Sequence, residues 1–170
     1  WRQKGSNALA NNPALAARLD WMGMDGLVLG ASLFSGDSGQ DTSVVNYEDL
    51  PTTMTDVHFQ YDQGGFRVRG LWADGNIGRD SGTDEELDGW YVEAGYDLLA
   101  GSDLSLTPFI RTSTHDLDAE SISLSEVEST TFGLAWQPIP DIIFKADHTT
   151  NSYADGNEEK IFGVAVGYVF

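Results

Sequence analysis

Residues 160–170 read Lys-Ile-Phe-Gly-Val-Ala-Val-Gly-Tyr-Val-Phe, and this stretch decides the fold class. Every second residue is bulky and apolar, namely Phe162, Val164, Val166, Tyr168 and Phe170, whereas the residues between them are mostly Gly or Ala. Side chains of a β-strand point alternately to its two faces. The stretch therefore predicts a strand with one bulky apolar face and one face of small residues.

The same period of two recurs along the whole chain, and no segment shows the periodicity of a helix. We expect nine antiparallel strands at about 14–21, 26–34, 53–62, 65–74, 89–98, 103–114, 127–136, 141–149 and 160–170. Short turns such as 23–25 alternate with long loops such as 35–52, so one end of the sheet is tight and the other is elaborated. This order is typical of an up-and-down transmembrane β-barrel.

The long loops hold most of the negative charge. The 170 residues contain 9 Lys plus Arg and 27 Asp plus Glu, for a formal net charge of -18. Of the 27 acidic residues, 18 lie in the segments 36–51, 74–88, 115–128 and 151–159, where Arg79 is the one base. Phosphates would be repelled by this charge, so we expect no nucleic acid partner.

Charged residues within the expected strands fall on the face opposite the bulky apolar one. On this face we expect the pore-lining residues of a water-filled lumen, namely Arg18, Arg67, Arg69, Glu93, Arg111 and Lys145. The positive potential of the five bases would favour the passage of anions. The alternative is that the bases simply pair with the acids of the same face, Asp20, Glu93, Asp97 and Asp147.

Aromatic residues of the bulky face gather near the strand ends. One group lies beside the short turns and a smaller one toward the long loops, as in the aromatic girdles of membrane barrels. The first group is Trp21, Tyr61, Phe66, Tyr96, Trp136, Phe144, Tyr168 and Phe170, and the second is Trp72, Trp90 and Phe162. A soluble β-sandwich would explain any single strand equally well, but nine strands that agree in turn order and facing favour the barrel.

An odd number of strands leaves an unpaired sheet edge, which is costly in lipid. Bacterial single-chain barrels generally have an even number of strands. We therefore expect residues 1–170 to be the C-terminal portion of a single transmembrane β-barrel domain whose N-terminal part is absent.

Two stretches resemble known outer-membrane proteins. The ending Gly167-Tyr168-Val169-Phe170 resembles the assembly signal of outer-membrane barrels, which would comprise Phe162, Val164, Val166, Tyr168 and Phe170. Residues 89–96 (GWYVEAGY) and 106–111 (LTPFIR) resemble the late strands of the family of phosphate-selective porins O and P. The resemblance implies a barrel of roughly sixteen or eighteen strands, usually trimeric, that passes small hydrophilic solutes. The regular ladder of bases known from the phosphate-selective members is absent from this sequence.

These features predict a porin of the bacterial outer membrane, a water-filled channel for passive diffusion of small hydrophilic solutes or ions, with no cofactor. Its expected partners are identical subunits in a homotrimer, outer-membrane lipid and lipopolysaccharide, and the solutes themselves. The alternative is an outer-membrane scaffold or adhesion protein with a closed lumen, whose acidic loops bind the partner.

Enzymatic and metal chemistry find little support in the sequence. The chain has no Cys, His115 falls in a loop, and the adjacent residues Asp147 and His148 point to opposite faces of their strand. Asp-rich segments at 116–118 and 155–159 lack a complete set of calcium ligands, so we interpret them as solvated loop charge. We expect neither a catalytic residue nor a metal site.

Overall fold

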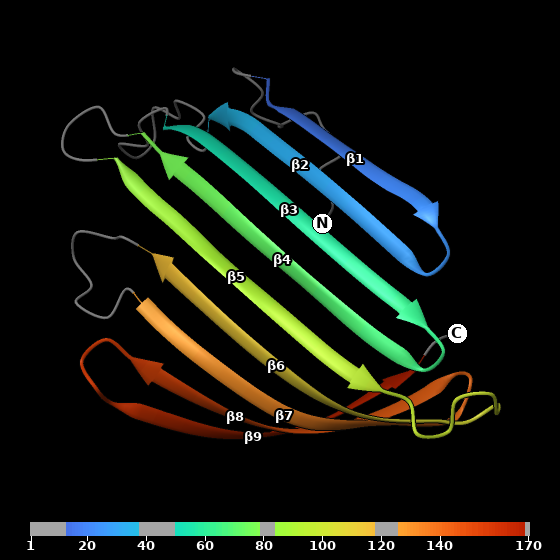
Figure 1. Ribbon diagram of the computed structural model, residues 1–170. Coiled ribbons are helices and arrows are strands. Elements are labelled where there is room, and N and C mark those ends of the chain that lie inside the picture. Colours follow the sequence, from blue (N-terminus) through green and yellow to red (C-terminus); the bar gives the residue numbers. More distant parts are fainter. Residues whose placement is uncertain (1–12, 38–49, 79–83, 118–125, 169–170) are drawn as a thin grey trace, which may run out of the picture.

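The computed structural model describes residues 13–37, 50–78, 84–117 and 126–168, and these form one antiparallel sheet in which strand order follows chain order (Figure 1). The described residues include no helix, and therefore none long and apolar enough to cross a membrane. The strands are β1 (Leu15–Met24), β2 (Leu27–Asp37), β3 (Pro51–Gln63), β4 (Phe66–Ile77), β5 (Glu85–Tyr96), β6 (Ser105–Leu117), β7 (Glu126–Ile139), β8 (Ile142–Tyr153) and β9 (Glu158–Tyr168).

All nine expected strands are confirmed, but several are longer than the sequence predicts. At the long-loop end β4 continues to Ile77, β5 begins at Glu85 and β8 continues to Tyr153, while at the short-turn end β1 continues to Met24 and β7 to Ile139. β6 continues to Leu117, so His115, which was expected in a loop, lies in a strand. No regular alternation of apolar and polar residues marks these extensions. Pairing with the neighbouring strand, which sequence periodicity does not report, sets these boundaries.

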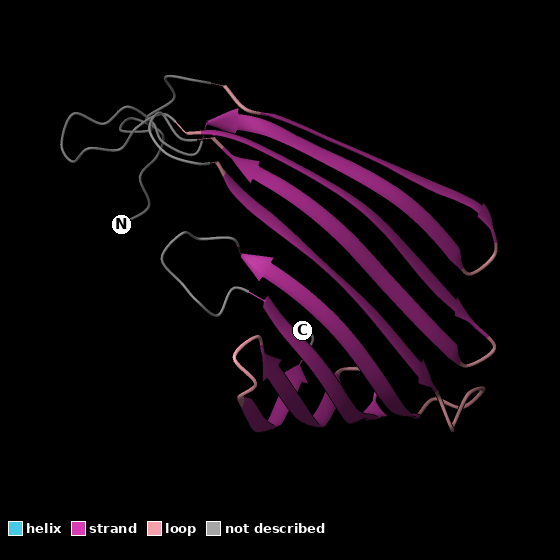
Figure 2. Cartoon of the chain, turned by 60° about the vertical axis from the view of Figure 1, so that its left-hand side comes forward, coloured by secondary structure: helices cyan, strands magenta, loops and turns pink. Residues whose placement is uncertain are grey.

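The sheet is a single curved layer that does not close on itself. Figure 2 shows it as an open trough, with β8 and β9 curling beneath the flatter expanse of β1 to β5. Among the described residues, β1 and β9 are the two edges. Because successive strands are antiparallel and nine is odd, β1 and β9 run in the same direction.

No apolar side chain of the described residues is buried. Large apolar side chains are instead exposed, with 58% of Phe132, 69% of Val164 and 78% of Leu19 accessible. A soluble domain buries the apolar face of a sheet against a second layer of structure, and no second layer is present in the part of the chain that the structure describes. The apolar face therefore requires another apolar medium or partner.

The connections at the short-turn end are held by local chemistry. Gly64 and Gly65 join β3 to β4 with φ of 62° and 87°, values that glycine adopts without a steric penalty. The β5–β6 connection is longer than predicted and spans 97–104. Oδ1 of Asp97 accepts hydrogen bonds from the backbone N–H groups of Leu99 and Leu106, both at 3.0 Å. Asp97 thus organises this connection.

Asp97 gives the fold a predictable pH response. Burial opposes ionisation of its carboxyl, but the hydrogen bonds from Leu106, Leu99 and Ser105 together with the charge of Arg67 outweigh burial, and the pKa lies below the ordinary value of 3.8. A lowered pKa stabilises the fold above the unfolded pKa, and this stabilisation is lost as the pH falls through the folded value. We expect Asp97→Asn to lower the urea midpoint of unfolding in lipid vesicles at pH 7, with a smaller difference from wild type below pH 3.8.

The control is Asp103→Asn, which changes an exposed residue of the same connection. A difference between wild type and Asp97→Asn that stays constant from pH 7 to pH 3 would contradict the assigned role.

Candidate functional site on the concave face

The strand register places all six predicted pore-lining residues on one face of the sheet. Arg69 lies opposite Glu93, and Glu93 lies opposite Arg111. Directly opposite residues share a face, and counting along the register adds Arg67, Arg18 and Lys145 to it. The shared face is confirmed, whereas the role of these residues in a pore remains a prediction.

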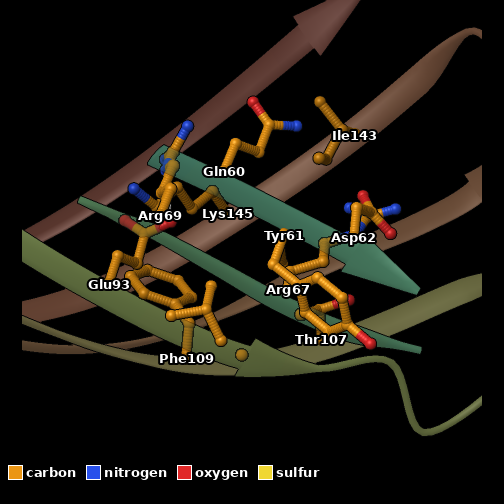
Figure 3. A pocket seen from close by; sticks show the side chains of 13 residues that line it. Gln60, Tyr61, Asp62, Arg67, Arg69, Glu93, Thr107, Phe109, Ile143 and Lys145 are labelled. Carbon is orange, nitrogen blue, oxygen red and sulfur yellow. Dashed lines mark hydrogen bonds and ion pairs between the residues drawn. The ribbon is translucent and has the colours of Figure 1, made fainter. Parts of the chain in front are cut away.

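This face is the concave one. A hollow of about 300 Å³ is lined by residues of six consecutive strands, β3 to β8 (Figure 3). It brings together four of the predicted residues, Arg67, Arg69, Glu93 and Lys145. Arg18 and Arg111 line two separate and more open depressions of the same face. The predicted residues therefore form a wall and not one compact site.

Four of the five bases of the concave face have a carboxylate partner. The closest pair joins Nη2 of Arg69 to Oε1 of Glu93 at 2.7 Å, with Nε of Arg69 at 2.9 Å from the same oxygen. The other pairs are Arg18–Asp20 at 2.8 Å, Arg67–Asp62 at 3.2 Å and Lys145–Asp147 at 3.7 Å. Pairing between the bases and acids of one face, the alternative left open by the sequence, is therefore realised at these positions. Such exposed pairs contribute only about 0–1 kcal/mol each.

Arg111 differs from the other four bases. No carboxylate of the described residues lies within 4.0 Å of it, and its guanidinium carbon lies 4.1 Å from the ring centre of Tyr91. Lys145 combines both kinds of contact, since its Nζ also lies 4.7 Å from the ring centre of Phe109. A cation over an aromatic face is attracted by the negative potential of the ring. Tyr91 and Phe109 thus hold charge in place without neutralising it.

A polar network at the β1–β3 side was not predicted from the sequence. His58 is central: Nε2 lies 3.0 Å from Oδ1 of Asp20 and Nδ1 lies 2.7 Å from Oδ1 of Asp56. Asp20 also accepts from Arg18 at 2.8 and 3.0 Å, and the hydroxyl of Ser32 donates to Asp56. Strand parity predicts that His58 faces inward on the same side as Asp56, two residues away, but its contact with Asp20, 38 residues away, depends on the register of the strands.

Gly30 makes the contact between His58 and Asp20 possible. It lies on β2 directly opposite both Asp20 of β1 and His58 of β3. A Cβ atom at this position would overlap the imidazole and the carboxylate. Because Gly30 has no side chain, Asp20 of β1 and His58 of β3 can contact each other across β2.

Neutral polar side chains cover the concave face from β6 to β8. The hydroxyls of Thr131 and Thr149 lie 2.8 Å apart, and Ser129 donates to Oδ1 of Asn151 at 2.8 Å. Within the described ranges, no group of three or more His, Cys, Asp or Glu residues is placed to hold a metal ion. The face therefore presents charged groups together with hydrogen-bond donors and acceptors.

The convex face is apolar and carries the predicted aromatics. Near the short turns, Phe66 and Tyr96 lie 4.7 Å apart between ring centres, and Trp136 stacks on Phe144 at 5.5 Å. His148 lies on this face opposite Phe162, which confirms that it points away from Asp147. Of the predicted assembly signal, Phe162, Val164, Val166 and Tyr168 share the convex face, while Phe170 lies outside the described residues.

Comparison with known proteins supports the fold. An anion-selective porin from Comamonas acidovorans has a TM-score of 0.70 at 13% identity, covering 92% of this chain and 49% of that chain. The outer-membrane-expressed OmpT of Vibrio cholerae has a TM-score of 0.61 at 11% identity, covering 95% of this chain and 57% of its own. A form of that OmpT lacking loop L8 has a TM-score of 0.62. Such low identities show the fold alone, that of part of an outer-membrane β-barrel.

Sequence comparison adds less. An uncharacterized protein of Aquifex aeolicus (strain VF5) is 23% identical over 193 residues, covering 99% of this chain and 44% of that protein. No family model matches the chain, so the resemblance to the phosphate-selective porins remains a prediction. The chain spans about half the length of the proteins it matches.

The role of Gly30 can be tested by adding one methyl group. We expect Gly30→Ala to lower the free energy of unfolding by about 1–3 kcal/mol, because the new Cβ displaces His58 or Asp20. Gly75→Ala is the matched control, since a Cβ at that concave-face glycine meets its nearest atom at an ordinary 3.4 Å. Urea unfolding in lipid vesicles measures both variants, and an equal effect of the two substitutions would contradict the bridging role.

Proposed function

We propose that the chain forms part of the wall of a bacterial outer-membrane porin, a water-filled channel through which small hydrophilic solutes and ions diffuse passively. One observation carries this proposal: the single-layer sheet has an apolar convex face and a charged concave face. A lumen filled with water solvates the charges of the concave face, and lipid covers the aromatics and aliphatics of the convex face. The opposite placement would bury charges such as Arg69 and Glu93 in lipid.

Strand length fits the thickness of a membrane. The strands contain 10 to 14 residues, which at about 3.3 Å per residue gives roughly 33–46 Å. At the tilt of membrane barrels these lengths cross an apolar band of about 25 Å. Acidic residues at the long-loop ends of the strands, such as Asp74, Asp88 and Asp116, then lie beyond this band on the external side.

Closure of the channel needs further strands. Because β1 and β9 run in the same direction, an antiparallel barrel closes only when an odd number of strands is inserted between their free edges. The proposed total of roughly sixteen or eighteen strands meets this condition. We propose that the added strands come from an N-terminal part of the same domain, that the barrel is a homotrimer, and that outer-membrane lipid and lipopolysaccharide surround it. The resemblance of the sequence to the phosphate-selective porins also supports a channel.

Single-channel recording tests the function directly. We expect the full-length protein to insert into planar lipid bilayers and to give stepwise, ohmic conductance increments in potassium chloride. The reversal potential in a salt gradient reports whether the concave-face bases or the acidic ends dominate selectivity. Bilayers that stay silent although heat-modifiable, folded barrel is present would contradict the channel and favour a closed-lumen scaffold.

The orientation of the two faces is tested by moving one charge across the sheet. Ile110 lies on the convex face and is 44% exposed, whereas Ser113 of the same strand lies on the concave face. We expect Ile110→Arg to lower the free energy of unfolding by about 2–4 kcal/mol, because an arginine near the membrane midplane is placed in lipid. Ser113→Arg is the control and is expected to cost less than about 1 kcal/mol in a wet lumen. Equal destabilisation by both variants, measured in vesicles, would contradict the proposed orientation.

A further inference from the structure

We propose that Arg111, held over the ring of Tyr91, is a binding site for small oxyanions, with carboxylate or phosphate groups as its ligands. The inference rests on the proposed channel and names the solute class for which that channel carries a dedicated contact. The proposed site is the side chain of Arg111, and it is distinct from the general attraction that all bases of the concave face together exert on anions. Three features of the structure support it.

The first feature is the absence of a competing carboxylate. Glu93 lies directly opposite Arg111 in the register, yet its Oε1 accepts a hydrogen bond from Nε of Arg69 and forms an ion pair with Nη2 of the same residue. Among the described residues no other acid lies within 4.0 Å of the Arg111 guanidinium. Arg111 is also only half-exposed, whereas Arg18, Arg67 and Arg69 are exposed and paired. A partly desolvated cation without a counter-charge attracts an anion more strongly than a paired one.

The second feature is the way in which Arg111 is held. A contact with the face of Tyr91 at 4.1 Å uses the charge of the guanidinium and leaves its N–H groups for other partners. The ring fixes the position of the group, so less conformational freedom is lost when a ligand binds. The fixed fork of N–H donors matches two oxygens of one carboxylate or phosphate. A chloride ion offers no second acceptor atom and therefore gains less.

The third feature is the neutral polar surface beside Arg111. Thr131 of β7 lies directly opposite Arg111, and Thr149 of β8 lies directly opposite Thr131. Ser113, two residues along β6, lies opposite Ser129. Ser129 already donates to Asn151 and Thr131 shares a hydrogen bond with Thr149, which leaves the proton of Ser113 and one proton of the threonine pair to donate to the remaining oxygens of a bound anion. None of these hydroxyls carries a negative charge that would repel it. Of the acids on this face, Asp20 and Asp56 lie on β1 and β3, while Glu93 and Asp147 are paired with Arg69 and Lys145.

Current block by oxyanions tests the site. Chloride current through the full-length channel is recorded while sodium succinate or sodium phosphate is added to one side at constant ionic strength. We expect a saturable reduction of the wild-type current by at least one of the two anions. Arg111→Lys keeps the positive charge but lacks the planar fork of N–H donors. We expect its reversal potential in potassium chloride to equal that of the wild type and its block by the oxyanion to be about tenfold weaker. Block by succinate alone identifies a carboxylate site, and block by phosphate alone a phosphate site.

Two further variants separate a site from a general field. Tyr91→Leu leaves every charge in place but removes the ring, and it is expected to weaken the block without moving the reversal potential. Arg69→Lys changes a base whose donors are engaged by Glu93, and its block is expected to weaken less than that of Arg111→Lys. Equal weakening by Arg69→Lys and Arg111→Lys, or a conducting wild type that neither anion blocks, overturns the oxyanion site alone. A channel that never conducts overturns the proposed function itself.

Discussion

The structure depends on the ladder of backbone hydrogen bonds between neighbouring strands. The described part of the chain has one layer and no buried apolar core, so the sheet is not held by packing against a second layer. Pairing satisfies the polar backbone groups, and the same pairing fixes which side chains share a face. A slip of one residue in any strand would exchange its two faces. Arg111 would then point to the convex face and Ile110 to the concave face.

This dependence explains how charge is distributed on the concave face. The carboxylate partner of each paired base lies either directly opposite it in the register or two positions away along its own strand. Arg69 finds Glu93 across the strand boundary, whereas Arg18 and Lys145 pair with acids two residues along. Charge on the concave face is therefore locally balanced at four of its five bases, and the exception is Arg111, which lies beside the ring of Tyr91. The local pattern of partners, more than the net charge of -18, determines the electrostatic character of this face.

Sequence reasoning recovered the layout of the fold because parity along a strand is a local property. The nine strands, the common face of Arg18, Arg67, Arg69, Glu93, Arg111 and Lys145, and the opposite facing of Asp147 and His148 all follow from alternation. The long-loop extensions of β4, β5 and β8 could not be predicted in this way, since apolar and polar residues do not alternate regularly in them. Specific partners were also beyond reach: the contact of His58 with Asp20 depends on the register of two strand pairs and on Gly30 between them. The hydrogen bonds of Asp97 within the β5–β6 connection were not predicted either, because the sequence pattern extends the strand to residue 98, whereas β5 ends at Tyr96.

The common direction of β1 and β9 also limits how a complete barrel of this kind could have arisen. Duplication of a nine-stranded unit, followed by closure of the two copies around a common axis, would bring β9 of each copy beside β1 of the other in parallel. Both seams would then interrupt the antiparallel ladder that satisfies the backbone in lipid. In the proposed barrel, the added strands therefore cannot be a plain tandem repeat of this sheet joined at its edges. A rotational repeat about the axis of such a barrel must contain an even number of strands.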